Sequence, residues 1–462
     1  MKVSIKNLGI LEHAEFTLGD LTVICGQNNT GKTYATYALF GFLYIWREVF
    51  SISIDDKKID QLLTDGSLHL DLQEYVKQSK EIIRRGCQAY TRQLSKIFAA
   101  PSDRFDSTSF IVEVDTGDIQ LEKEFDREIS TARSELLSIT KEEKIAELII
   151  TLLTEKENVK IPKHILGSII SDAIKDVVFT QFFPNPFIAS AERTGAAIFR
   201  KELNFARNRL LEEISQTGKN IDPIELLLTG YQDYALPVKN NVDFTRQLES
   251  VVKKNSFIAE SHPDVLEDFA DIIGGSYVVT RDDELYYTPR KSKRLRLSME
   301  ESSSAVRSLL DIGFYLRHEA RMGDLLIVDE PELNLHPENQ RRVARLFTRL
   351  VNLGIKVFIT THSDYIIKEL NTLIMLNHDK PHLKRIAEEE SYRNEELITA
   401  ERIKVYIAEQ ALIKLEGKSR RTKCQTLTPA DIDPKLGIEA RSFDITIEKM
   451  NQIQERIVWG ED

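Results

Sequence analysis

The stretch Gly26-Gln27-Asn28-Asn29-Thr30-Gly31-Lys32-Thr33 indicates which fold to expect. It follows an apolar, β-branched run, Leu21 to Cys25, which predicts a buried strand, and it precedes the apolar stretch from Tyr34 to Phe50, which predicts a helix. The two glycines let backbone N–H groups turn toward a phosphate, and the helix start adds its positive dipole end. We therefore expect a phosphate-binding loop at these positions.

Within this loop, each polar residue type has a separate role to fill. Lys32 is expected to reach the β- and γ-phosphate oxygens of a nucleotide, and the Thr33 hydroxyl is expected to ligate Mg²⁺. The other residues expected to line the phosphates are Gly26, Asn28, Asn29 and Gly31.

A second apolar run, Leu325 to Val328, ends in the acidic pair Asp329-Glu330. Asp329 is placed to hold the hydration shell of Mg²⁺, and Glu330 is placed to polarise an attacking water. The next predicted strand, Lys356 to Thr361, is followed by His362, which we expect to sense the γ-phosphate. These positions predict nucleotide hydrolysis at the ends of neighbouring strands.

Composition narrows the class of protein further. The chain has 462 residues, 42% of them hydrophobic and 29% charged, which is a globular balance and excludes a mostly disordered, collagen-like or membrane protein. The longest apolar run, Ala38 to Trp46, is too short to span a bilayer, and the first residues lack the apolar core of a signal peptide. We expect a cytoplasmic protein with no membrane partner. Its three cysteines show no disulfide or zinc spacing.

In their order along the chain, five motifs together resemble those of ABC-type ATPases, more narrowly the RecF/SMC/OLD-like branch. They are the loop Gly26–Thr33, the serine cluster Ser302–Ser304, Asp329-Glu330-Pro331-Glu332, Asn334-Leu335-His336-Pro337 and Thr361-His362-Ser363. The resemblance covers roughly residues 1–50 and 177–380. It implies an ATPase head that binds ATP and Mg²⁺ and forms a homodimer or higher homo-oligomer through bound ATP.

The resemblance also implies roles for single residues. Asp329 becomes the metal residue, Glu330 the catalytic base and His362 the switch histidine. The serine cluster, which by itself is first a helix-capping signal, becomes the signature that contacts the γ-phosphate held by the other subunit. Serines replace the usual signature glycines, so either Ser302 or Ser303 is the contacting residue.

One element of the family pattern is not found directly. The glutamine that normally senses Mg²⁺ has no clear counterpart after the phosphate loop, and the polar segment Ser190 to Thr194 is the candidate for its place.

The domain organisation follows from strand–helix alternation. We expect an α/β fold with a mostly parallel sheet and an antiparallel N-terminal part. The expected ranges are 1–50 for the N-terminal lobe of the ATPase core, 51–176 for a helical insertion, 177–400 for the C-terminal lobe with a further helical insert at 196–270, and 401–462 for a small α+β cap or partner-docking piece. Ile145, Leu148, Ile149 and Leu152 are expected on one helix face, and Val177–Phe179 and Thr372–Leu376 are expected as strands.

The biological role is open between three alternatives. The architecture is similar to that of Septu-type anti-phage ATPase subunits such as PtuA, which implies a separately encoded nuclease or effector as partner. The rivals are a RecF-like repair ATPase and a nucleotide-gated scaffold with little turnover. The relatives known as OLD nucleases carry a further metal site, and the only similarly spaced pair after His362, Asp431 and Asp433, lies in a Pro-flanked turn.

Nucleic acid is a further partner to consider. The net charge of −11 gives no support for it, but residues 290–296 hold five basic side chains. This run is either a solvated hairpin edge or a contact to the backbone of DNA or RNA.

Overall fold

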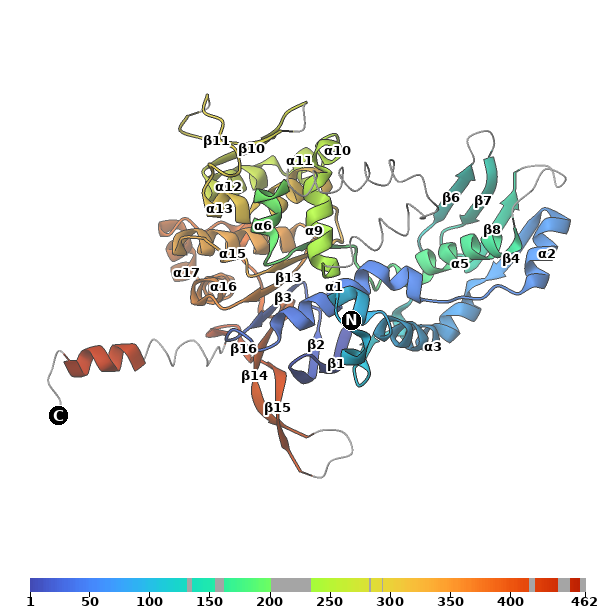
Figure 1. The fold of residues 1–462 in the computed structure, drawn as a ribbon, viewed down its shortest axis with the longest axis horizontal. Helices are drawn as coiled ribbons and strands as arrows, with labels where there is room; N and C mark the ends of the chain where they lie inside the picture. The colour runs from blue at the N-terminus through green and yellow to red at the C-terminus, as the bar shows by residue number, and fades with distance from the viewer. Residues whose placement is uncertain are drawn as a thin grey trace, which may run out of the picture. The chain divides into compact units, whose positions relative to one another are not determined.

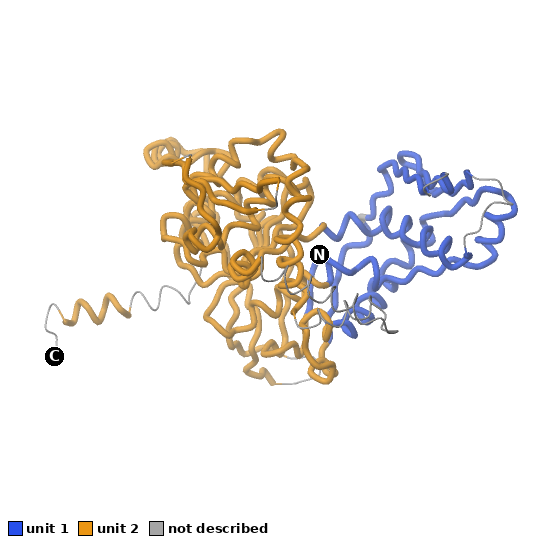
Figure 2. The backbone as a smooth tube through the Cα atoms, turned by 45° about the horizontal axis from the view of Figure 1, so that its top comes forward, with its two compact units in different colours: residues 1–4, 42–93, 109–184 blue, residues 5–41, 94–108, 185–462 orange. Residues whose placement is uncertain are grey.

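The chain divides into two compact units, each described by itself (Figure 2). Unit 1 comprises residues 1–4, 42–93 and 109–184, and unit 2 comprises residues 5–41, 94–108 and 185–462. The computed structural model describes residues 1–130, 135–153, 162–200, 234–281, 284–292, 294–414, 420–438 and 449–457.

Unit 2 is built on a six-stranded sheet in the order β15-β14-β3-β13-β12-β9. Figure 1 labels β15, β14, β3 and β13 of this sheet. Its strands are β3 (Leu21–Cys25), β9 (Pro186–Ala189), β12 (Leu325–Asp329), β13 (Lys356–Thr361), β14 (Ile403–Ile413) and β15 (Thr422–Pro429). Every neighbouring pair is parallel except β14 with β15. The predicted α/β fold with a mostly parallel sheet is therefore confirmed.

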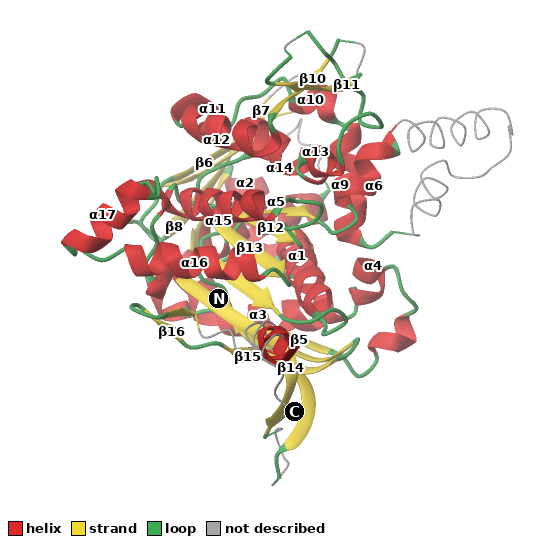
Figure 3. Ribbon diagram, turned by 90° about the vertical axis from the view of Figure 1, so that its left-hand side faces the viewer, coloured by secondary structure: helices red, strands yellow, loops and turns green. Residues whose placement is uncertain are grey.

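Helices cover this sheet because its central strands are apolar on both faces. Every residue of β3 and of β12 is buried. Figure 3 shows helices α15 (Pro337–Asn352) and α16 (Asp364–Leu376) alongside the strands, and their apolar side chains join β3 and β13 in one core.

The remaining elements of unit 2 are mostly short. The N-terminal strands β1 (Lys2–Leu8), whose first residues belong to unit 1, and β2 (Leu11–Thr17) are neighbours in a smaller sheet, and α1 (Lys32–Val49) follows β3. The other strands are β10 (Gly275–Val279), β11 (Leu285–Pro289), β16 (Ile432–Asp433) and β17 (Gly437–Ile438). The other helices are α4 (Leu94–Phe98), α6 (Arg193–Ile198), α9 (Leu236–Arg246), α10 (Leu248–Val251), α11 (Phe257–Ser261), α12 (Pro263–Ile273), α13 (Ser304–Ser308), α14 (Leu310–Phe314) and α17 (Pro381–Glu389). The single-turn helical segments are η1 (Ser102–Phe105), η4 (Tyr315–Glu319), η5 (Asn394–Glu396) and η6 (Ala400–Arg402).

Unit 1 corrects the prediction of a helical insertion at 51–176. It contains a four-stranded antiparallel sheet in the order β4-β8-β7-β6. The strands of this sheet are β4 (Ser67–Asp71), β6 (Phe125–Ser130), β7 (Glu135–Lys141) and β8 (Glu147–Leu152), and a further strand of the unit, β5 (Ser109–Glu113), lies outside it. The helices of unit 1 are α2 (Asp56–Asp65), α3 (Leu72–Thr91), η2 (Thr116–Asp118) and α5 (Lys163–Phe179). The segment is therefore mixed α and β.

Three apolar segments take a different secondary structure from the predicted one. The residues assigned to a helix face lie on or beside β8, where Leu148 and Ile150 are fully buried at alternate positions. Residues 177–179 end helix α5, and residues 372–376 end helix α16. Short apolar runs fit either state by periodicity, and long-range packing decides between them.

The C-terminal range 401–462 is also corrected in part. Strand β14 pairs in parallel with β3, the strand before the phosphate loop, so it completes the core sheet and is not a separate cap. Residues 449–457 of this range are helical, and residues 201–233 of the predicted insert at 196–270 lie outside the described residues. Within the described residues, no helix is both long and apolar enough to cross a membrane.

Candidate functional site

Parallel pairing brings the predicted site residues to one edge of the unit 2 sheet. Asp329 of β12 is paired with Thr360 of β13, and Thr361 is paired with Cys25 of β3. The carboxyl ends of parallel strands meet at the same edge, where ligands of open α/β sheets bind. The phosphate loop, the acidic pair and His362 therefore begin side by side.

The phosphate loop is closed by its own lysine. Lys32 Nζ donates to the carbonyl oxygens of Gly26 at 2.9 Å and Gln27 at 2.8 Å, and the side chain is almost fully buried. Burial lowers the pKa of Lys32, while the nearby carboxylates, Glu330 first, oppose that shift. Helix α1 begins at Lys32, so its free N–H groups face the loop.

The rest of the loop is open to solvent. Asn28, Asn29 and Thr33 are exposed, and Asn29 adopts a left-handed backbone with φ of 60°. Gly31 has φ of 96°, which a side chain rarely tolerates, and a Cβ there would also meet Leu11. The loop therefore needs its second glycine and presents its polar groups outward.

Asp329 carries a carboxylate that is only half satisfied. One oxygen accepts a hydrogen bond from the Thr360 hydroxyl, and Oδ2 has no partner among the described residues although the side chain is buried. Burial raises the pKa of Asp329 to about 6. A buried carboxylate oxygen without a partner fits a cation or its hydration water. Asp329 is thus suited to hold Mg²⁺ or its hydration water.

Glu330 stands at a strained turn. Its φ is 52°, a left-handed conformation that is uncommon for residues other than glycine. Its N–H donates to the Thr360 carbonyl oxygen at 3.1 Å, and its own carbonyl accepts from Arg193 Nη2 at 2.8 Å. The N–H and the carbonyl oxygen of Glu330 are both hydrogen-bonded, so the backbone turn that carries its carboxylate is fixed at the end of β12.

His362 is oriented by a second acidic residue, Glu332. The Glu332 Oε1 atom accepts the backbone N–H of His362 at 2.7 Å and lies 3.1 Å from its ring Nδ1. Glu330 Oε1 lies 3.7 Å from the same Nδ1. Burial raises the pKa of Glu332, and its Oε2 has no partner within the described residues. With Nδ1 turned to the carboxylates, Nε2 is the ring atom left for a ligand.

The segment proposed as the glutamine counterpart lies after β9 at the same sheet edge. Glu192 Oε2 accepts from the Tyr37 hydroxyl at 2.8 Å, and its charge contributes to the raised pKa of Asp329. Glu192 is therefore the residue of this segment whose charge acts on the acidic end of β12.

Arg193, next in the chain, ties three parts of the site together. It is fully buried, and its Nη1 donates to the carbonyl oxygens of Asp329 at 2.6 Å and Ser190 at 2.8 Å. Its Nε donates to Ser308 O at 2.6 Å, in the helix after the serine cluster. Asp311, whose pKa burial raises to about 7, supplies opposite charge.

The two candidate residues of the serine cluster differ in their exposure to solvent. Ser302 is buried, and its hydroxyl donates to Ser298 O at 2.7 Å. Ser303 is exposed and caps helix α13 by accepting from Val306 N–H at 3.3 Å. Ser303 is therefore the more exposed of the two candidate residues.

Sequence reasoning did not assign roles to Arg193, Glu332 or Thr360. Arg193 bonds to backbone carbonyls that lie 115 to 137 residues away, and no local spacing predicts such contacts. Glu332 is the last residue of the acidic motif, and the sequence alone indicates no separate role for it.

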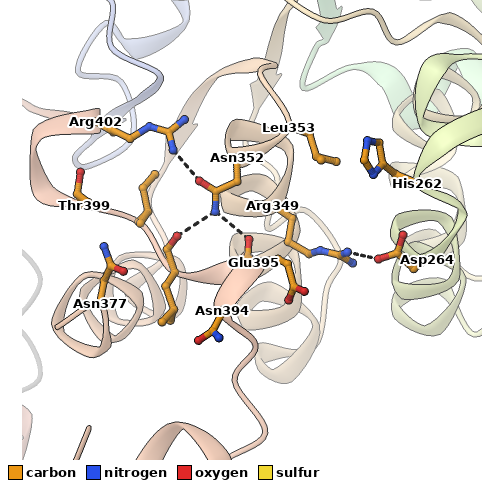
Figure 4. Close-up of a pocket in the computed structure, with 12 residues that line it drawn as sticks. His262, Asp264, Arg349, Asn352, Leu353, Asn377, Asn394, Glu395, Thr399 and Arg402 are labelled. Carbon is orange, nitrogen blue, oxygen red and sulfur yellow. Dashed lines mark hydrogen bonds and ion pairs between the residues drawn. The ribbon is translucent and has the colours of Figure 1, made fainter. Parts of the chain in front are cut away.

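A separate pocket of about 630 Å³ lies away from this sheet edge (Figure 4). Arg349 is paired with Asp264 there, and Asn352 bridges Arg402 at 2.6 Å to the carbonyl oxygen of Glu395 at 2.8 Å. These groups mainly bind one another and fasten η5 to helix α15, which is a structural role.

Comparison with solved structures finds SMC heads. An SMC head domain from Thermotoga maritima has 9% identity and a TM-score of 0.30, covering 93% of this chain and 98% of that one. An Smc head bound to the C-winged helix domain of ScpA has 10% identity and a TM-score of 0.31, and the match covers 92% of this chain and 97% of that one. A third structure is an Smc head with an extended coiled coil, bound to the C-terminal domain of ScpA derived from Pyrococcus furiosus. It has 13% identity and a TM-score of 0.28, and the match covers 80% of this chain and 90% of that one. At such scores these likenesses carry no argument about function.

Sequence comparison gives the family. No curated protein sequence matches the chain. The family model described as AAA ATPase domain matches residues 1–367, well over half of the chain. With the phosphate loop and acidic strand end in place at one sheet edge, the chain belongs to the AAA ATPase domain family.

Proposed function

We propose that the chain binds and hydrolyses ATP, with Glu330 as the base that activates water. The observation that supports this most is the half-satisfied buried carboxylate of Asp329 beside Glu330, on the sheet edge that carries Lys32. Ordinary structural carboxylates complete their hydrogen bonds when buried. Here one oxygen is left for a ligand.

The roles of the residues follow from their positions. Lys32 exchanges its two loop carbonyls for the β- and γ-phosphate oxygens, which is a stronger, charge-assisted contact. Glu330 takes a proton from water, and its peptide is held by Arg193 and Thr360 while it does so. His362 presents Nε2 toward the γ-phosphate. Mg²⁺, held by Thr33 and Asp329, neutralises phosphate charge when bound.

We further propose that two copies form each complete site, one supplying the phosphate loop and the other supplying Ser303. The exposed position of Ser303 at the start of α13 supports this, because the other candidate, Ser302, is buried. A symmetric dimer would then contain two such composite sites.

Mixing two inactive variants tests this arrangement. Lys32→Ala removes a copy's own nucleotide site, and Ser303→Arg blocks the site of its partner. Each variant alone should show no ATP hydrolysis, and an equimolar mixture should recover activity, since the mixed dimer keeps one intact site. A mixture as inactive as its components would contradict the composite site, and active Ser303→Arg protein would exclude this serine.

For the biological role we propose control of a separately encoded effector in anti-phage defence. The support is the resemblance of the motifs to Septu-type ATPase subunits, which is an argument from architecture. Expressing the chain with its neighbouring reading frames in a susceptible host should lower phage plating, and Lys32→Ala should abolish that protection. Protection that survives Lys32→Ala would remove ATP from the mechanism.

A further inference from the structure

The side chain of Gln340, in the first turn of helix α15, bridges the two strand ends that carry the acidic pair and His362. Its Nε2 donates to the Leu335 carbonyl oxygen at 2.9 Å, and its Oε1 accepts from the Ser363 hydroxyl at 2.5 Å. Leu335 follows β12, and Ser363 follows β13, the neighbouring strand of the sheet. One amide therefore connects the segment after the acidic pair to the residue after His362.

The direction of each of these hydrogen bonds is fixed by its partner. A backbone carbonyl can only accept, so the amide nitrogen of Gln340 faces Leu335 and the amide oxygen faces Ser363. The Ser363 hydroxyl must then donate to Gln340, while it accepts the N–H of Ile366 at 3.3 Å as the N-cap of α16. The bridge therefore needs a side chain that has a donor and an acceptor on the same group.

On the β12 side, the bridge ends on a segment that is itself fixed. Glu330 and Asn334 both adopt a left-handed backbone, with φ of 52° and 60°. Between them, the Leu333 N–H donates to the Glu330 carbonyl oxygen at 3.2 Å, and the Leu335 N–H donates to the Glu332 carbonyl oxygen at 3.0 Å. A displacement of the Leu335 carbonyl is therefore passed along this segment to the base.

On the β13 side, the bridge ends next to the histidine. The His362 N–H donates to Glu332 Oε1 at 2.7 Å, and the Ser363 N–H donates to Thr361 Oγ1 at 3.0 Å. The backbone before and after the His362 ring is thus held by hydrogen bonds, and Gln340 supplies the one that reaches it from helix α15.

We propose that Gln340 is a positioning residue that sets the placement of the Glu330 carboxylate relative to the His362 ring. Glu330 Oε1 lies 3.7 Å from His362 Nδ1, so the two side chains are close enough for a small shift of either segment to alter their geometry. Misplacement of reacting groups by about 1 Å can cost about 100-fold in rate. The inference rests on the proposed function, because that function assigns Glu330 and His362 their roles.

The first test compares the kinetics of Gln340→Met with those of wild type. Methionine has a similar length but forms neither bond, so kcat should fall about 10-fold while KM for ATP stays within about 2-fold. The control is Gln73→Met, which makes the same change at an exposed position in the first turn of helix α3 and should behave as wild type does. A wild-type kcat in Gln340→Met would overturn the proposal.

A pH profile of Gln340→Glu separates positioning from packing. The protonated carboxyl group donates to the Leu335 carbonyl and accepts from Ser363, whereas the ionised group has no donor. The ratio of kcat in Gln340→Glu to kcat in wild type should therefore rise as the pH is lowered from about 8 to about 6. The same ratio for Gln340→Met should stay constant. Equal pH dependence of the two ratios would contradict the positioning role.

A third measurement does not depend on hydrolysis. The chain has nine histidines, and NMR of protein labelled at histidine Cε1, without nucleotide, identifies the His362 signal as the one lost in His362→Gln. Gln340→Met should shift this signal and leave those of His69 and His164 in unit 1 unchanged. An unchanged His362 signal would overturn the proposal. A shifted signal in a chain whose wild type does not hydrolyse ATP would contradict the proposed function and keep Gln340 as the residue that positions His362.

Discussion

The phosphate loop and the acidic end of β12 face the same site, but their polar groups are satisfied to different degrees. Lys32 is bonded to two carbonyls of its own loop, and the other polar side chains of the loop are largely open to water. At the end of β12, by contrast, Asp329 and Glu332 are buried and each has an oxygen without a partner in the described part of the chain.

The two parts of the site therefore differ in how favourable they are without a ligand. The loop is stable without a ligand and must exchange its bonds to bind one. The acidic end is unfavourable until a ligand completes it, and Arg193 holds it in that condition through the carbonyls of Asp329 and Glu330. Binding should therefore be controlled by the loop, and turnover and stability by the acidic end.

The largest effect is expected in the loop. Lys32→Ala should weaken ATP binding by about 100-fold or more, since two charge-assisted contacts to phosphate are lost. Isothermal titration calorimetry with ATP and Mg²⁺ measures this, with the exposed Lys57→Ala as the control. Wild-type affinity in Lys32→Ala would mean that the loop does not control binding.

On the acidic side, Arg193 is expected to act on turnover. Arg193→Met should lower kcat at least about 10-fold while KM for ATP changes little, because Glu330 loses the bond that fixes its carbonyl. Arg193→Lys should restore part of kcat. If Arg193 had a purely structural role, Arg193→Met would lower the fraction of folded protein, which circular dichroism measures. An equal kcat per folded molecule in wild type, Arg193→Met and Arg193→Lys would contradict the positioning role.

A third effect, on stability, is expected at Asp329. The pKa of Asp329 is raised in the folded state from 3.8 to about 6, so ionisation costs about 3 kcal/mol of folding free energy above pH 6, and this cost vanishes as the pH falls toward 4. Ligand-free Asp329→Asn should therefore unfold at higher urea than wild type at pH 7.5, with the gap closing toward pH 4. The exposed Asp103→Asn should show no such pH dependence; a gap that widens on acidification would show that the pKa of Asp329 is not raised.

The same contrast explains what the sequence could predict. The loop from Gly26 to Thr33 and the Asp329-Glu330 pair are contiguous motifs, so the chemistry of each can be predicted from neighbouring residues. That they lie at the same edge of the sheet follows from the parallel order of the strands. The pairing of β14 with β3 joins residues almost 400 positions apart, and its apolar alternation fits any half-buried strand. For β8, apolar residues at adjacent and alternate positions suited a helix face equally well until the sheet partner was known.

The state of Glu330→Gln in ATP and Mg²⁺, measured by light scattering together with phosphate release, tests the proposed ATP site most directly. The substitution keeps the shape and the Asp329 carboxylate but removes the base, so hydrolysis should fall by about 100-fold or more while ATP stays bound. Glu330→Gln should therefore form a stable dimer of twice the monomer mass that persists as long as ATP does. Phosphate release at the wild-type rate from a protein that remains monomeric would contradict the proposed ATP site.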